Sequence, residues 1–176
     1  MVKKIKIKRT VWPSIFTLLN MFLGFISISF SFRQGYNNFI IAGWLIFFAA
    51  IFDGLDGKVA RLVHGSSDFG VEIDSLADLI SFVIAPAMLS YNMFFFKFNG
   101  WGLILSFTFV IFGAIRLARF NVIAHRESVN HFIGMPSPLA ALAIVSFIMF
   151  IIVHKKILNN IYFPINIIFP SYYITI

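Results

Sequence analysis

The sequence contains no cysteine, and only 12% of its 176 residues are charged. The lack of cysteine excludes disulfide bridges and a thiolate metal site, although it does not identify the compartment. The scarcity of charge excludes an ordinary soluble domain, because 60% of the residues are hydrophobic and a globule of this size has too little interior to bury them. The mean hydropathy of +0.91 therefore indicates a protein that uses lipid as its solvent.

Five apolar runs have about the 20 residues that a helix needs to cross the hydrocarbon core of a bilayer. The predicted spans cover residues 14–32, 39–60, 71–95, 101–120 and 138–153. A sixth, near 157–176, is less regular, because Pro164 and Pro170 each remove a helical hydrogen bond that lipid cannot replace. Residues 1–176 are thus expected to form one all-α membrane bundle, with a basic segment at 1–12 and an uncleaved first span.

The distribution of basic residues predicts the orientation of this bundle. Ten fall at the end where the chain starts: Lys3, Lys4, Lys6, Lys8, Arg9, Lys58, Arg61, Arg116, Arg119 and Arg126. Four fall at the other end: Arg33, Lys97, Lys155 and Lys156. The positive-inside rule then places the N-terminus in the cytoplasm. Because these residues are mostly juxtamembrane, where anionic lipid attracts them, the net charge of +7 does not indicate nucleic-acid binding.

The few acidic residues are concentrated in one stretch. Six of the seven in the chain lie there, namely Asp53, Asp56, Asp68, Glu72, Asp74 and Asp78. Asp53 and Asp56 are three residues apart, and Asp74 and Asp78 are four apart, so each pair lies on one helix face. Since a short loop joins the second and third spans, we expect these spans to be antiparallel neighbours whose acidic ends meet.

Four carboxylates at one membrane depth need a positive counterpart, because each buried charge near lipid costs about 2.5 kcal/mol or more. Lys58 and Arg61 supply two charges at most and follow the first acidic pair too closely to reach every carboxylate. All-oxygen sites suit hard divalent cations such as Mg²⁺, Mn²⁺ or Ca²⁺. Two such ions bridged by shared carboxylates would form a clamp for phosphoryl transfer.

The spacing of these acids and their neighbours resembles the signature of the CDP-alcohol phosphatidyltransferases. The pattern D-x-x-D-G-x-x-A-R, then eight residues, then G-x-x-x-D-x-x-x-D, is matched by Asp53, Asp56, Gly57, Ala60, Arg61, Gly70, Asp74 and Asp78. The resemblance implies a six-helix membrane enzyme, often a homodimer, that binds a CDP-linked lipid and two divalent metals. Such an enzyme joins the phosphatidyl group to an alcohol and releases CMP.

Further segments resemble the members of this family that use L-serine as the acceptor. They are PSIFTLLNMFLGF, FGVEIDSLADLISFVIAPAM, RLARFNV and FIGMPSPLAA. The resemblance implies that CDP-diacylglycerol and L-serine give phosphatidylserine and CMP, with Mg²⁺ or Mn²⁺, at the cytoplasmic face of a bacterial inner membrane. The chain departs from the family at Ser14, where an asparagine usually follows the proline.

The same resemblance assigns roles to individual residues. Asp53, Asp56 and Asp74 are expected to hold the metals, and Asp78 to be a ligand that also takes the proton from the serine hydroxyl. The expected contacts of the CDP-lipid are Thr17, Gly57, Ala60, Arg61 and Ser67. Three of these residues have alternative roles, since Gly57 and Ala60 could instead serve close helix packing and Arg61 could be a positive flank.

Arg116 and Arg119 lie three residues apart at the end of the fourth span, so they can face one pocket. Either they anchor the topology, or they bind the serine carboxylate or a lipid phosphate. An acceptor such as glycerol 3-phosphate or an inositol phosphate would call for a denser basic pocket. A divalent-cation transporter is the alternative from another class, but its acids would be spread across the bilayer instead of clustering at one depth.

Overall fold

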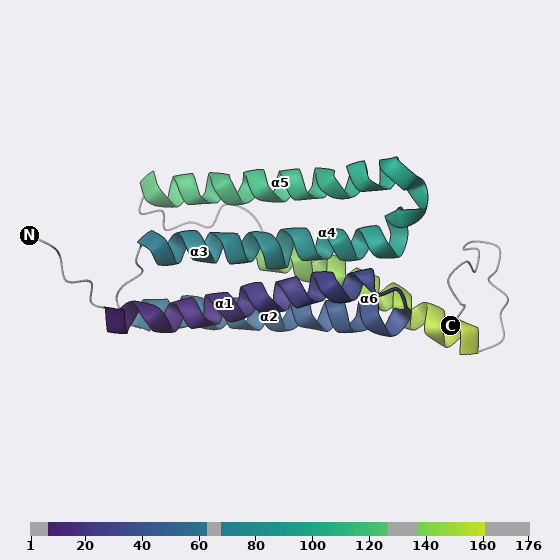
Figure 1. Cartoon of the computed structure of the whole chain (residues 1–176), viewed down its shortest axis with the longest axis horizontal. Helices are drawn as coiled ribbons and strands as arrows, with labels where there is room; N and C mark the ends of the chain where they lie inside the picture. The colour runs from purple at the N-terminus through teal and green to yellow at the C-terminus, as the bar shows by residue number, and fades with distance from the viewer. Residues whose placement is uncertain (1–6, 63–67, 127–136, 161–176) are drawn as a thin grey trace, which may run out of the picture.

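The computed structural model describes residues 7–62, 68–126 and 137–160, and all the elements within these ranges are helices. The helices lie lengthwise beside one another (Figure 1). Five segments are long and apolar enough to cross a membrane: Ile15–Phe32, Tyr36–Val59, Phe69–Phe98, Gly100–Val122 and Ser137–Lys155. These confirm the five predicted spans within a few residues, and the protein is an integral membrane protein. The predicted sixth span falls almost entirely in 161–176, outside the described residues.

The first two helices are joined by a tight turn. Helix α1 spans Ile7–Phe32 and α2 spans Tyr36–Leu62. Between them Gly35 has φ 127°, a conformation that glycine adopts without the steric penalty of a side chain. Its carbonyl accepts from the backbone N–H of Asn38 at 3.1 Å, which begins the next helix. The short connection makes α1 and α2 antiparallel neighbours along their whole length (Figure 1).

The third span changes its helical form along its length. It consists of α3 (Asp68–Asp78), a π-helical turn (Leu79–Ile84), α4 (Ala85–Ser90), a second π-helical turn (Tyr91–Phe95) and a short 3₁₀ turn (Phe96–Phe98). Pro86 lies in the first turn of α4 and cannot donate a backbone hydrogen bond. Just before it, the backbone N–H of Ala85 donates to the carbonyl of Ile80, five residues back. The first π turn therefore starts immediately after the last residue of the acidic stretch.

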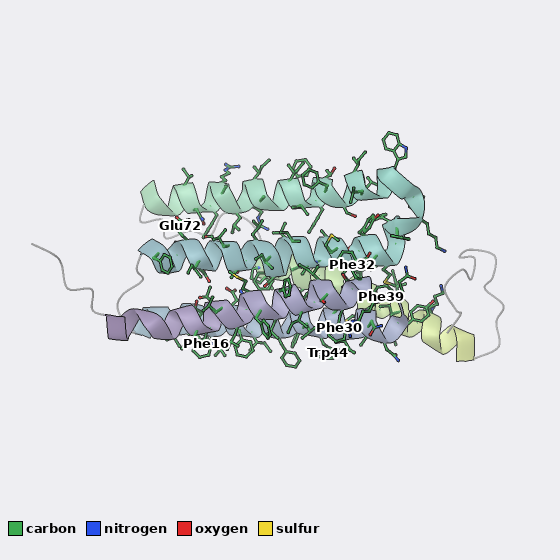
Figure 2. The ribbon with its side chains drawn as sticks, in the orientation of Figure 1. Phe16, Phe30, Phe32, Phe39, Trp44 and Glu72 are labelled. Atoms are coloured by element: carbon green, nitrogen blue, oxygen red, sulfur yellow. The ribbon has the colours of Figure 1, made fainter. Side chains whose placement is uncertain are left out.

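The remaining helices, α5 (Asn99–Arg126) and α6 (Ser137–Asn160), pack on the third span. A buried apolar core joins α2, the third span and α6, and its largest fully buried side chains are Ile46, Phe82, Leu89, Ile148 and Ile152. Other aromatic side chains point away from this core. Phe16 and Trp44 lie on the outer side of the α1–α2 pair (Figure 2), and the Trp44 side chain is 48% exposed. An exposed aromatic surface of this kind is what lipid would cover.

The inner face of α1 is small and polar. Thr17, Asn20, Gly24, Ser27 and Ser31 recur at intervals of three and four residues, and all five are buried. Such residues let two helices approach closely in a membrane and form hydrogen bonds between them. The hydroxyl of Ser27 donates to the Ala42 carbonyl of α2 at 2.8 Å, and the hydroxyl of Ser81 donates to the Asn20 carbonyl at 2.9 Å. Helix α1 is thereby held against both α2 and the third span.

Candidate active site

The acidic residues lie at one end of the bundle. This end brings together the start of α1, the end of α2, the start of α3 and the end of α5 (Figure 1). Here α1 packs against both α2 and α3, whereas α2 meets the third span mainly through the first π turn and α4. The sequence predicted that the acidic ends of the second and third spans meet, and they do. The contribution of α1 to the same site was not predicted.

Three carboxylates form the centre of this site. Asp53 comes from α2, and Asp74 and Asp78 come from successive turns of α3. Each can offer one carboxylate oxygen such that the three oxygens lie within 4.8 Å of one another. All three side chains are half-buried. Two helices far apart in the sequence thus bring like charges together, as the spacing predicted.

The fourth acidic residue, Asp56, lies beside this group of three. Its side chain is 6% exposed, and one of its carboxylate oxygens accepts a hydrogen bond from the hydroxyl of Thr17 on α1. Asp56 is close enough to Asp53 and Asp74 to repel both electrostatically. Thr17, which the resemblance assigned to the CDP-lipid, therefore contacts an acidic residue of the site directly.

Several polar atoms around the acids are buried without a hydrogen-bond partner among the described residues. They are Oδ1 of Asp56, Oδ1 of Asp78 and both side-chain atoms of Asn20. A buried polar atom without a partner costs about 1–3 kcal/mol, and more if it is charged. Carboxylate oxygens in this condition are suited to a hard divalent cation. The oxygen-only donor set of Asp53, Asp74 and Asp78 therefore fits Mg²⁺ or Mn²⁺.

The structure describes the other predicted contacts of the CDP-lipid only in part. Gly57 lies on α2, one residue after Asp56, and is exposed. Ala60 and Arg61 belong to the last turns of α2, but their side chains are outside the described part of the chain. Ser67 falls outside the described residues altogether. The structure thus leaves the predicted CDP-lipid contacts of these residues as predictions.

Arg116 and Arg119 lie on α5 and are both exposed. Just beyond them, the side-chain amide of Asn121 donates to the hydroxyl of Ser75 at 2.7 Å. Ser75 follows Asp74 on α3, so this bond ties the end of α5 to the acidic segment. The arginines are therefore carried on a helix that is connected to the site, and their contact with a substrate remains a prediction.

Two residues of this site were not singled out from the sequence, Asn20 and Asn121. Asn20 is fully buried beside Asp78. Asn121 lies where α5 contacts α3, and Asn20 lies where α1 contacts the π turn that follows α3. A detectable signal existed for Asn20, because it shares a helix face with Thr17 inside an apolar run.

Comparison with known families agrees with the geometry. The family described as CDP-alcohol phosphatidyltransferase matches residues 10–172. The chain belongs to this family. The match covers all the described helices except the first residues of α1.

Individual relatives are also similar to the chain. A Helicobacter pylori (strain ATCC 700392 / 26695) protein is 45% identical over 135 residues, which cover 77% of this chain and 56% of that protein. A Methanocaldococcus jannaschii protein is 39% identical over 145 residues, 82% of this chain and 63% of that protein. A Bacillus subtilis protein is 35% identical over 133 residues, which cover 76% of this chain and 72% of that protein. All three are named CDP-diacylglycerol–serine O-phosphatidyltransferase, and the chain spans little more than half the length of the Helicobacter protein.

Proposed function

We propose that this protein transfers the phosphatidyl group of CDP-diacylglycerol to the hydroxyl of L-serine, giving phosphatidylserine and CMP. The observation that carries the proposal is the group of three carboxylates, Asp53, Asp74 and Asp78, at one end of a membrane bundle. The family supports the use of a CDP-linked lipid. The names of the relatives support serine as the acceptor.

Asp53, Asp74 and Asp78 would hold the divalent cations, with Asp56 beside them. A divalent cation bound there supplies positive charge where negative charge develops on the phosphate oxygens. The three carboxylates, one from α2 and two from α3, would hold that charge at this end of the bundle. Thr17 holds one oxygen of Asp56, so the orientation of this fourth carboxylate is set by α1.

Asp78 is the proposed base. In the reaction, the serine hydroxyl oxygen bonds to the phosphorus of the phosphatidyl group while the bond from that phosphorus to the oxygen of CMP breaks. The hydroxyl proton passes to the Asp78 carboxylate, and CMP leaves with the electron pair of the broken bond. A base must reach the proton it accepts. One Asp78 oxygen lies within 4.8 Å of one oxygen each of Asp53 and Asp74, so Asp78 can serve both as a ligand and as the base of this site.

The surroundings of the acids suit a substrate with lipid tails. Leu55 lies between the two acidic residues of α2, and Leu76 between Asp74 and Asp78; their side chains are 39% and 54% exposed. Phe69 at the start of α3 is 66% exposed. Exposed apolar side chains next to a polar site can contact acyl chains while the diphosphate meets the carboxylates. A substrate anchored in the bilayer could therefore reach the site without leaving it.

We propose that Arg116 or Arg119 binds the serine carboxylate. Purified protein would be assayed for CMP release with serine, glycerol 3-phosphate and inositol as acceptors. Serine should be strongly preferred, and Arg→Ala at the responsible position should raise the KM for serine much more than the KM for CDP-diacylglycerol. Serinol, which lacks the carboxylate, should be a poor acceptor for the parent. Preference for glycerol 3-phosphate would contradict serine as the acceptor while leaving the chemistry in place.

We propose that the acidic end of the bundle faces the cytoplasm of a bacterial cell. Because the chain has no cysteine, single cysteines can be introduced without background labelling. Glu72→Cys marks the acidic end, and Gln34→Cys marks the turn at the opposite end. An impermeant thiol reagent added to intact spheroplasts should label only the second, and the reverse pattern would contradict this orientation.

The homodimer that the family resemblance implies is part of the same proposal. Helix α5 offers a broad apolar surface, with Leu103, Phe107 and Phe112 all more than half exposed. This surface is available to lipid or to a second copy of the chain. The mass of the protein in nanodiscs or detergent, measured by light scattering with the lipid contribution subtracted, distinguishes one copy from two.

A further inference from the structure

Asn20 has a buried amide that the proposed reaction does not yet use. Its side chain is fully buried, and neither the amide nitrogen nor the amide oxygen has a hydrogen-bond partner among the described residues. An amide in this position costs more than an apolar side chain of similar size would, because its lost water contacts are not replaced. A buried side-chain amide at this cost indicates that a hydrogen-bonding group lies within its reach.

The backbone of Asn20 is fixed against the third span. The hydroxyl of Ser81 donates to the Asn20 carbonyl at 2.9 Å, and both groups are buried. One turn further along α1, a side chain at Gly24 would collide with the Ser81 hydroxyl oxygen. The absence of a side chain there allows α1 to approach Ser81 this closely. Ser81 lies one turn after Asp78 on the third span, so this contact holds Asn20 at a defined place beside the acidic segment.

The neighbour of this amide is Asp78. The Asn20 side chain approaches the Asp78 carboxylate, whose Oδ1 is itself buried without a partner among the described residues. A donor and an acceptor that both lack partners thus lie side by side. The preceding turn of α1 shows the same arrangement in completed form, since the Thr17 hydroxyl donates to Asp56. Thr17 and Asn20, three residues apart on one face of α1, therefore lie against two acidic residues of the site, one on α2 and one on α3.

We propose that Asn20 is a positioning residue that acts through Asp78. Its amide nitrogen donates to Oδ1 of Asp78, which leaves the other carboxylate oxygen directed at Asp53 and Asp74. The inference rests on the proposed function, because it assigns a task within the same carboxylate site. Groups that hydrogen-bond to a metal ligand orient that ligand, and their loss typically weakens metal binding.

The test compares Asn20→Leu with a matched control, Asn92→Leu, in the full chain reconstituted in nanodiscs. Asn92 is a half-buried asparagine of the third span whose side-chain amide donates to the Ser31 hydroxyl of α1 at 3.1 Å. This contact lies near the opposite end of the bundle. Mn²⁺ affinity is measured by electron paramagnetic resonance, and kcat by CMP release at saturating substrates. We expect Asn20→Leu to weaken Mn²⁺ binding by about 10-fold or more and to lower kcat similarly. Asn92→Leu should leave both at parental values.

Two further variants keep the inference open to refutation. Asn20→Ala, which removes the amide without adding bulk, should show the same losses if the leucine does not fit. In an Asp78→Asn background, Asn20→Ala should cause no further loss of kcat, because the residue acts through the carboxylate. Parental Mn²⁺ affinity and kcat in Asn20→Ala would overturn the inference alone. Failure of the parent to bind Mn²⁺ at all would overturn the proposed metal site and this inference with it.

Discussion

Replacement of Thr17 by valine tests whether α1 contributes to the carboxylate site. Valine has nearly the same shape as threonine but no hydroxyl, so the exchange removes the hydrogen bond to Asp56 with little change in packing. The side chains of Thr17 and Asp56 are both buried, with exposed fractions of 2% and 6%. The other oxygen of Asp56 has no partner among the described residues, so the variant leaves this carboxylate without a protein donor there.

The size of the effect follows from the charge of the acceptor. A hydrogen bond to a charged group contributes about 1.5–3 kcal/mol. Since each 1.36 kcal/mol corresponds to a factor of ten in rate, full expression of this energy in the transition state lowers kcat/KM by about 10- to 150-fold. Initial rates of CMP release from CDP-diacylglycerol, with serine in excess, measure this loss. Thermal unfolding in the same detergent reports any accompanying loss of stability.

Thr17→Ser is the matched control, because it keeps the hydroxyl and removes only a methyl group. We expect its kcat/KM to stay within about fivefold of the parent, since a lost methyl group costs about 1 kcal/mol or less. If the valine variant retained parental activity, Thr17 would hold Asp56 for stability alone. If both variants lost activity equally, the retained hydroxyl of serine would not protect activity, and the packing at this position, not the hydrogen bond, would be responsible. Either result would refute the role assigned to Thr17.

Three other results are expected. Asp74→Asn should lower activity by at least about 10²-fold because it removes a charged ligand, whereas Glu72→Gln, an exposed acid on the same helix, should retain activity; equal losses would contradict the assignment. EDTA should abolish CMP release and Mg²⁺ or Mn²⁺ should restore it, so full activity in excess chelator would exclude a metal requirement. Gly24→Ala should destabilise the protein by about 1–3 kcal/mol, since the new methyl group would meet Ser81. Gly100→Ala, where no atom of the described residues would lie within 4 Å of the new methyl group, should leave the unfolding temperature unchanged.

Much of the bundle was predictable because lipid imposes a simple rule on the sequence. Each span must be apolar for about 20 residues, and the predicted boundaries at 39–60 and 101–120 agree closely with the helices observed. The approach of Asp53 to Asp74 and Asp78 was predictable as well. It follows from helical spacing and from a short loop that returns the chain to the same side of the membrane.

The features that were not predicted depend on packing between helices. Periodicity alone could not show that α1 lies against both α2 and α3, which is what brings Thr17 and Asn20 to the acids. Nor did the sequence reveal the π turn that follows Asp78, although Pro86 marked a break in regular hydrogen bonding. The orientation of Arg116 relative to a substrate depends on contacts that helical spacing does not determine.

The measurement that tests the account most directly is the stoichiometry of the reaction catalysed by the purified parent protein. With CDP-diacylglycerol, Mg²⁺ or Mn²⁺ and radiolabelled serine, CMP and labelled phosphatidylserine should form in equal amounts, and omission of serine should suppress CMP release. Asp78→Asn, measured in parallel, should lower both products by roughly 10²- to 10⁴-fold, the worth of a positioned general base. Formation of CMP without labelled lipid, or parental rates in the Asp78→Asn variant, would contradict phosphatidyl transfer to serine at this carboxylate site.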